Sequence, residues 1–132
     1  MSASAVVLLG LIGWSIVLTI MVVAVRFKPI LGGTIVFAQD GTDLPGLGQR
    51  VTRAHGNSLE NLAIPAALIL YGLITDQSAV TDGLAMALLG ARIGQSVIHI
   101  ISAAQPAVLV RAAFFFVQVV IWIIWALGFY NA

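Results

Sequence analysis

Four long apolar segments alternate with short polar ones along the chain. Each apolar segment approaches or exceeds the roughly 20 residues that a membrane-crossing helix needs. The stretch 26–48 contains Pro29, Pro45 and a scatter of glycines and aspartates, so it is predicted to be a loop. The links 75–82 and 102–107 are short, so the helices they join are predicted to be antiparallel neighbours. The pattern predicts helices over residues 4–25, 49–75, 82–103 and 106–130.

Composition supports the same interpretation. Of the 132 residues, 61% are apolar and only 8% are charged, which is too little charge to cover the surface of a soluble domain. We therefore predict an all-α integral membrane protein, a four-helix antiparallel bundle forming one domain over residues 1–132. A formal net charge of +1 gives no basis for binding nucleic acid. The chain has no cysteine, so any thiol chemistry would have to use a ligand's thiol.

The basic residues predict the orientation of the helices in the membrane. Five of them fall at one predicted membrane face, whereas the opposite turn carries Asp76 and Asp82 and no basic residue. The positive-inside rule then makes 26–48 a cytoplasmic loop and puts both termini on the non-cytoplasmic side. The first apolar run precedes its nearest positive charge, unlike a cleavable signal peptide. We expect a multi-pass protein of the bacterial inner membrane. The five residues are Arg26, Lys28, Arg50, Arg53 and Arg111.

Polar residues in the second predicted helix follow a helical spacing. Arg50, Arg53, Asn57 and Glu60 are separated by three, four and three residues, which places them on one face. Asn61 lies at the edge of this stripe. Charged groups at membrane depth are costly unless they face protein, partner charges or water. The stripe is therefore predicted to face the interior of the bundle.

The third predicted helix carries a matching stripe of Arg92, Gln95 and His99. Counted along antiparallel helices, Glu60 and Arg92 reach a similar depth, which predicts an ion pair between them. Such a pair is open to two interpretations: it fixes helix register, or it contacts a ligand. His99 is either a hydrogen-bonded structural group or a proton carrier. No second histidine or carboxylate stands at ligand spacing, so no metal site is predicted.

Two further residues bear on a site. Pro65 lies inside the second predicted helix, where it frees the carbonyl of Asn61 and is predicted to bend the helix next to the polar stripe. Arg111 lies near the start of the fourth predicted helix. It is either an interfacial anchor that reaches the headgroups or a cation placed to stabilise an anion.

Three segments, taken together, resemble the MAPEG family, the membrane-associated proteins of eicosanoid and glutathione metabolism. The run R-A-x-x-N-x-x-E-N over residues 53–61 is similar to the family signature. The segments 91-ARIGQSVIH-99 and 105-QPAVLVRAAFFF-116 are similar to its third-helix and fourth-helix motifs. The order of the motifs, the chain length and the four helices all match.

The resemblance implies a homotrimer with a glutathione site between adjacent subunits near the cytoplasmic face. Residues matching Arg53, Asn57, Glu60 and Asn61 would hold the carboxylates and amine of the tripeptide, and Arg92 would belong to the same network. Arg111 would stabilise the glutathione thiolate and is the predicted catalytic residue. Three weaker candidates for glutathione binding are Arg26, which loosely matches a first-helix arginine, and Gln95 and His99, which stand where many catalytic members have tyrosines.

The resemblance implies a glutathione transferase or peroxidase that acts on hydrophobic electrophiles or lipid hydroperoxides. Glutathione would be its co-substrate, and its other partners would be membrane lipid and a hydrophobic small molecule. Many catalytic members have tyrosines at the positions of Gln95 and His99, and eicosanoid-making members often have tyrosine at the position of Asn61. These departures argue against a leukotriene or prostaglandin synthase. The alternative is a non-catalytic membrane subunit that binds a lipid, another thiol or a larger membrane complex. A solute pathway is disfavoured because the charges form one cluster.

Overall fold

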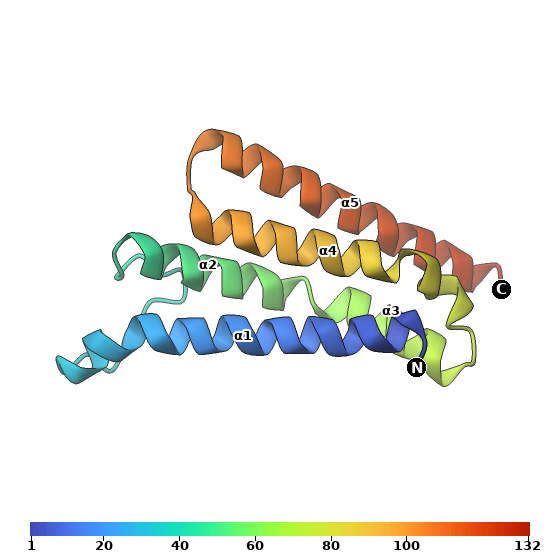
Figure 1. Cartoon of the computed structure of the whole chain (residues 1–132), viewed down its shortest axis with the longest axis horizontal. Coiled ribbons are helices and arrows are strands. Elements are labelled where there is room, and N and C mark those ends of the chain that lie inside the picture. Colours follow the sequence, from blue (N-terminus) through green and yellow to red (C-terminus); the bar gives the residue numbers. More distant parts are fainter.

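The computed structural model describes residues 1–132, and all of its regular structure is helical (Figure 1). Helices α2 and α3 are two parts of a single apolar span, Gly46–Ile74, so the chain has four helical segments long and apolar enough to cross a membrane. This confirms the predicted class, a four-helix membrane bundle. The helices are α1 (Ala3–Leu31), α2 (Gly46–Glu60), α3 (Ala63–Ile74), α4 (Ala79–Ile101) and α5 (Gln105–Tyr130).

The spans run alternately up and down, and Figure 1 shows both termini at one end of the bundle. The other end holds the last turns of α1, the loop 32–45, the start of α2 and the turn between α4 and α5. We call it the basic end, because it carries five of the six basic residues of the chain: Arg26, Lys28, Arg50, Arg53 and Arg111.

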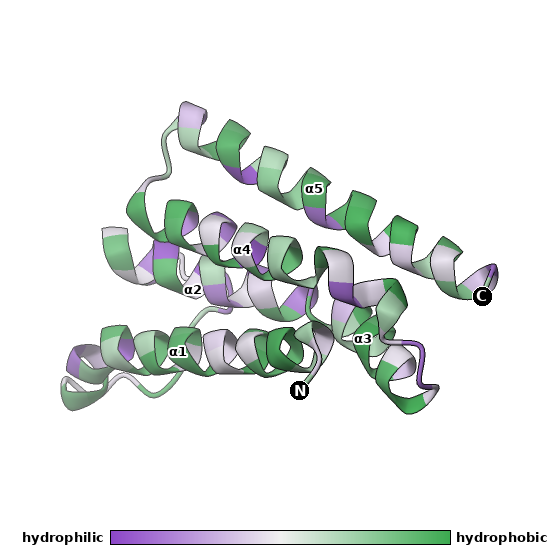
Figure 2. Cartoon of the chain, turned by 45° about the vertical axis from the view of Figure 1, so that its right-hand side comes forward, coloured by the Kyte–Doolittle hydropathy of each residue, from purple (hydrophilic) through white to green (hydrophobic).

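Helix α4 is the central element of the bundle. It packs against α5 most extensively and also against α1 and α2, whereas α2 and α5 barely touch each other. Hydrophilic segments gather on α2 and α4, and α1 and α5 are mainly hydrophobic (Figure 2). A polar helix, α2, and a mainly apolar helix, α5, therefore both pack against α4.

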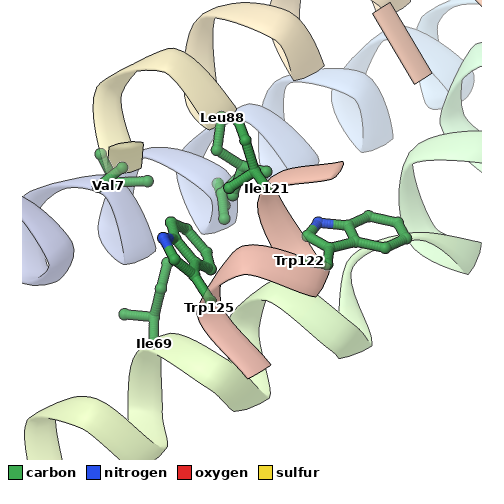
Figure 3. Close-up of a cluster of buried hydrophobic side chains, with 8 residues drawn as sticks. Val7, Ile69, Leu88, Ile121, Trp122 and Trp125 are labelled. Atoms are coloured by element: carbon green, nitrogen blue, oxygen red, sulfur yellow. The ribbon is translucent and has the colours of Figure 1, made fainter. Parts of the chain in front are cut away.

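The apolar core lies toward the end that holds the termini. Figure 3 shows Trp125 and Ile121 of α5 meeting Val7 of α1, Ile69 of α3 and Leu88 of α4. Trp125, Val7 and Ile69 are completely buried. Close packing of these large side chains holds the four spans together at this end. Toward the basic end the interior is mixed, because polar side chains such as Arg92 and Gln95 are buried there as well as apolar ones such as Val51.

A hydrogen-bonded cluster joins α1 to α4 beside the termini. The Asp82 carboxylate accepts hydrogen bonds from the Ser4 backbone N–H at 2.9 Å and from its hydroxyl at 2.6 Å. The Ser4 hydroxyl is also 2.6 Å from that of Thr81. Asp82 lies in the first turn of α4 and satisfies a free N–H in the first turn of α1, so its charge interacts favourably with two helix N-termini.

The first helix continues further than its apolar run predicts. Residues 26–31 were expected to begin the loop, but α1 includes them and ends at Leu31. Pro29 is tolerated because it stands in the last turn and removes only one helical hydrogen bond. Gly32 then closes the helix with its N–H directed to the carbonyls of Lys28 and Pro29.

The second span is broken into α2 and α3 at Asn61–Leu62. Pro65 has no N–H to donate to the Asn61 carbonyl four residues earlier, so the helical ladder is interrupted there. The Asn61 N–H still bonds to the Asn57 carbonyl at 3.3 Å, and helical bonding resumes from Ala66 to Leu62 at 3.1 Å. The break therefore lies directly beside the polar stripe, where the sequence predicts it.

Candidate functional site

A recess of about 400 Å³ opens between α2, α4 and α5 in the polar half of the bundle. Its volume lies within the about 300–1,000 Å³ range of small-molecule sites. We call it the central recess. It brings together residues that are far apart in the sequence. Its lining is Asn57, Glu60, Asn61, Gln95, His99, Val108, Arg111, Ala112 and Phe115.

The walls of the central recess differ in chemistry. Helices α2 and α4 contribute amides, a carboxylate and an imidazole. Helix α5 contributes an apolar wall of Val108, Ala112 and Phe115, with Arg111 as its only charged group. Val108 and Phe115 are 43% and 37% exposed, so this wall continues onto the outer surface of the bundle. The recess can therefore accept a polar molecule on one side and an apolar one on the other.

Glu60 and Arg111 bring opposite charges to this recess without pairing within the chain. Neither forms an ion pair within 4.0 Å, and the Arg111 Nε is buried without a hydrogen-bond partner. An unpaired buried polar group is costly, so a ligand that supplies the missing partners gains their interaction energy. This arrangement suits a ligand that carries both a cationic and an anionic group.

A second recess, the loop recess, lies across α2 at the basic end and measures about 390 Å³. It shares Asn57, Glu60 and His99 with the central recess and adds Arg53. The Arg53 Nε donates to the backbone carbonyl of Asp40 at 3.3 Å, so Arg53 holds the loop while its side chain lines the recess. The remaining lining residues are Gln39, Asp40, Thr52 and Gly56.

The loop beside Arg53 has a compact turn at Asp40. The Asp40 carboxylate accepts from the Thr42 backbone N–H at 3.1 Å and from its hydroxyl at 2.9 Å. These hydrogen bonds lower the pKa of Asp40 below its ordinary value of 3.8. Gly41, between them, has a φ of +74°, a conformation that favours glycine. The turn thus keeps an ionised carboxylate at the mouth of the loop recess.

A third recess, the α1 recess, also measures about 390 Å³ and extends from Glu60 to Arg26 of α1. The Arg26 guanidinium lies 4.9 Å from the centre of the Phe37 ring, within cation–π distance. His55 lines the same recess and is 3.1 Å from the Thr19 hydroxyl of α1. Glu60 lines all three recesses, so they meet around one carboxylate.

The predicted ion pair between Glu60 and Arg92 is wrong. Arg92 is 3% exposed and donates long hydrogen bonds of 3.4 Å to the Asn57 Oδ1 and to the Asn61 carbonyl. The second acceptor is the carbonyl that Pro65 leaves free. Counting along the helices predicted only that Glu60 and Arg92 lie at a similar depth. The break in the span exposes the Asn61 carbonyl, and Arg92 donates to this carbonyl instead of pairing with Glu60. Arg92 lines none of the recesses, but it donates to Asn57 and Asn61, which do line the central recess.

Two other polar residues of the stripes also make contacts inside the protein. The Gln95 Oε1 accepts from the Gln118 Nε2 of α5 at 2.9 Å, and Gln118 is completely buried. This bond ties the floor of the central recess to its apolar wall. The Arg50 Nε donates to the Ile100 carbonyl at 2.7 Å in the last turn of α4, where a cation is favourable. Arg50 thus belongs to the scaffold.

The structure places most of the predicted site residues around these recesses. Asn57, Glu60, Asn61, Gln95, His99 and Arg111 line the central recess. Arg53 lines the loop recess and Arg26 the α1 recess. Three lining residues could not be predicted, because loop residues such as Gln39 and Asp40 have no periodicity and Thr52 lies off the stripe. No group of three or more histidine, cysteine, aspartate or glutamate side chains could hold a metal ion.

Comparison with known proteins gave one match. A model of the MAPEG family matches residues 4–130, nearly the whole chain. Searches of curated proteins and of solved structures found no significant match.

Proposed function

We propose that this chain, which belongs to the MAPEG family, is a membrane-bound glutathione transferase or peroxidase. One observation carries the proposal: Glu60 and Arg111 face one recess from different helices and lack partners within the chain. Glutathione has two carboxylates, one ammonium group and one thiol. The recesses around Glu60 offer cations for the carboxylates and a carboxylate for the ammonium group.

The chain has no cysteine, so the reacting thiol would be that of glutathione. A nearby cation favours the thiolate form, and Arg111 is the one cation that lines the central recess. The apolar wall of Val108, Ala112 and Phe115 beside it would receive a hydrophobic electrophile from the bilayer. The thiolate would attack the electrophilic carbon and form a carbon–sulfur bond. In a substitution the leaving group would depart with its bonding electrons, and in an addition the π bond would break and the resulting carbanion would take up a proton.

Peroxide reduction would use the same thiolate. It would attack the distal oxygen of a lipid hydroperoxide, and the oxygen–oxygen bond would break to release an alcohol after protonation. Glutathione would be left as a sulfenic acid. A second glutathione would reduce it, giving glutathione disulfide and water.

We further propose that the chain works as a homotrimer. Glu60 and Arg53 are exposed in the single chain although they lie in an apolar span. Charges at that depth are costly when they face lipid. A second copy of the chain covering this face would exclude lipid from Glu60 and Arg53 and would complete the site.

The decisive experiment compares Arg111→Ala and Arg111→Lys with the wild type in detergent-purified protein. Glutathione binding is measured by calorimetry, and conjugation is measured with a chromogenic hydrophobic electrophile. We expect Arg111→Ala to bind glutathione but to lose conjugation by about 100-fold, in line with the loss of one charge-stabilising group. Arg111→Lys should retain part of the activity. Full activity in Arg111→Ala would overturn the assignment of Arg111.

The second candidate function is a non-catalytic subunit of the same family. The central recess has no hydroxyl group in its lining, and Gln95 uses its carbonyl on Gln118. Arg111 alone would therefore have to activate a thiol. Glutathione binding without turnover of electrophiles or hydroperoxides, together with copurification of a stable membrane partner, would favour this candidate.

The basic end also supports a proposed orientation, with the loop 32–45 in the cytoplasm and both termini outside. The cysteine-free chain makes this straightforward to test. A single cysteine in place of Thr34 in the loop should react with an impermeant maleimide only after the cell is opened. A single cysteine at Thr75, at the opposite end, should react in intact cells with a permeabilised outer membrane. The reverse result would invert the topology.

A further inference from the structure

The largest recess in the structure is separate from the candidate site. It measures about 510 Å³ and lies at the basic end, between the last turns of α1 and the start of α2. None of its lining residues belongs to the central, loop or α1 recess. Its apolar walls are Val25, Pro29, Leu44, Pro45 and Leu47. We call it the basic-end crevice.

The crevice has one charged group, Lys28, and no acidic residue lines it. A carboxylate there would have neutralised the ammonium group from within the chain. Instead the ammonium stands exposed at the rim of an apolar cavity. The chemistry that complements this arrangement is an apolar chain joined to an anionic head.

The depth of the crevice in the bilayer follows from the length of α1. Its 29 residues would extend about 43 Å at 1.5 Å per residue, whereas the hydrocarbon core is about 30 Å thick. The apolar run of α1 ends at Val25, and Lys28 lies about one turn beyond it. Val25 therefore lies near the edge of the hydrocarbon, and Lys28 lies at the level of the phosphate groups.

The surface around the crevice fits the same depth. Phe27, Ile30 and Leu31 of α1 are 60%, 48% and 73% exposed, and Leu47 of α2 is 52% exposed. Apolar side chains this exposed are unfavourable in water, and the interface between acyl chains and headgroups accommodates them, while the Lys28 ammonium group can extend from that level to the phosphate groups. The basic residues nearby attract anionic lipid headgroups.

From these observations we infer that the basic-end crevice binds one anionic glycerophospholipid. An acyl chain would lie against Val25, Leu44 and Leu47, and the phosphate would contact the Lys28 ammonium group. The inference does not rest on the proposed function, because the crevice shares no residue with the candidate site. Loss of glutathione activity would leave it unaffected, and loss of lipid binding would leave the glutathione proposal unaffected.

The test is native mass spectrometry of the detergent-purified protein with two phospholipids that share the same acyl chains. One has the anionic phosphatidylglycerol head and the other the zwitterionic phosphatidylcholine head. The wild type should retain one phosphatidylglycerol per chain in preference to phosphatidylcholine. Lys28→Gln should lower that preference about fivefold, which corresponds to about 1 kcal/mol. Lys28→Arg should keep it.

Leu47→Trp supplies a steric test, because the larger side chain would fill the crevice. It should abolish retention of both lipids, whereas Ile35→Trp, at a loop position that is 87% exposed and outside the crevice, should not. Equal retention of the two lipids by the wild type, or unchanged preference in Lys28→Gln, would overturn the inference. Occupation of the crevice by a second copy of the chain would also overturn it. Should Leu47→Trp fail to fold, the Lys28 variants decide alone.

Discussion

Replacing Arg92 by methionine tests whether this arginine stabilises the break between α2 and α3. Methionine keeps much of the side-chain volume but removes both donors. Arg92 is 3% exposed and donates to the Asn57 Oδ1 and the Asn61 carbonyl, each at 3.4 Å. Of these two acceptors, the Asn61 carbonyl is available because Pro65 has no N–H to bond to it, whereas the Asn57 Oδ1 does not depend on Pro65. The informative experiment is therefore a double-mutant cycle with Arg92→Met and Pro65→Ala.

The size of the effect follows from the two acceptors. A buried acceptor left without a partner costs about 1–3 kcal/mol, and both bonds are long, so the low end applies to each. Arg92→Met should therefore destabilise the protein by about 2 kcal/mol, or somewhat less because a buried charge is also removed. Alanine at position 65 restores an N–H that can bond to the Asn61 carbonyl. In that background Arg92→Met should cost about 1 kcal/mol less.

The assay is reversible unfolding in mixed micelles, followed by the fluorescence of the buried tryptophans. Glutathione affinity of the same variants is measured by calorimetry. Because Arg92 lines no recess but holds Asn57 and Asn61, Arg92→Met should weaken glutathione binding, and Pro65→Ala should not restore the bond to Asn57. Arg92→Lys, which can reach one acceptor, is expected to be intermediate.

Strict additivity of Arg92→Met and Pro65→Ala would refute the assigned role, because it would show that Arg92 does not interact with the carbonyl freed by Pro65. Unchanged stability in Arg92→Met would refute it as well. Unchanged stability with lost glutathione binding would instead make Arg92 a direct ligand contact.

Three further predictions concern other contacts. Thr42→Val should raise the pKa of Asp40 toward its ordinary value, observable by NMR titration. Because the pKa of Asp40 is lowered in the folded loop, the ionised carboxylate contributes to folding stability at neutral pH, and this contribution is lost as the pH falls below about 4. Asp82→Asn weakens the cap of α1 and should lower stability by about 1 kcal/mol in the same unfolding assay, with no effect on glutathione binding. Gly94→Ala would bring a methyl group within 2.9 Å of the Phe114 ring and should destabilise the α4–α5 contact by about 1–3 kcal/mol, of which the higher helix propensity of alanine offsets about 1 kcal/mol; increased stability in Gly94→Ala, or unchanged stability in Asp82→Asn, would contradict the packing described.

The spans could be predicted from the sequence because a bilayer imposes a single requirement, a long apolar helix, on each of them. The break at Asn61–Leu62 could be predicted too, since Pro65 removes a particular hydrogen bond whatever the surroundings. The extension of α1 through Pro29 could not. It depends on how the last turn is closed by Gly32 rather than on hydropathy.

The candidate site was only partly predictable. Helical spacing put Asn57 and Glu60 on one face, and both line the central recess. Spacing cannot choose between partners at similar depth, however, and Arg92 contacts the Asn61 carbonyl instead of Glu60. That Asp40 lines the loop recess could not be predicted either. It depends on the fold of an irregular loop around Gly41, where neither periodicity nor composition indicates which side chain points toward the bundle.

The central position of α4 has a consequence for how this protein could be modified. Because the two walls of the central recess rest on α4 and not on each other, the width of that opening depends on the bulk of the residues beneath them. Gly94, against which the Phe114 ring of α5 packs, is such a residue. Substitutions that alter the range of accepted molecules are therefore to be sought among the α4 residues that pack beneath α5 outside the recess, as well as among the residues that line the opening.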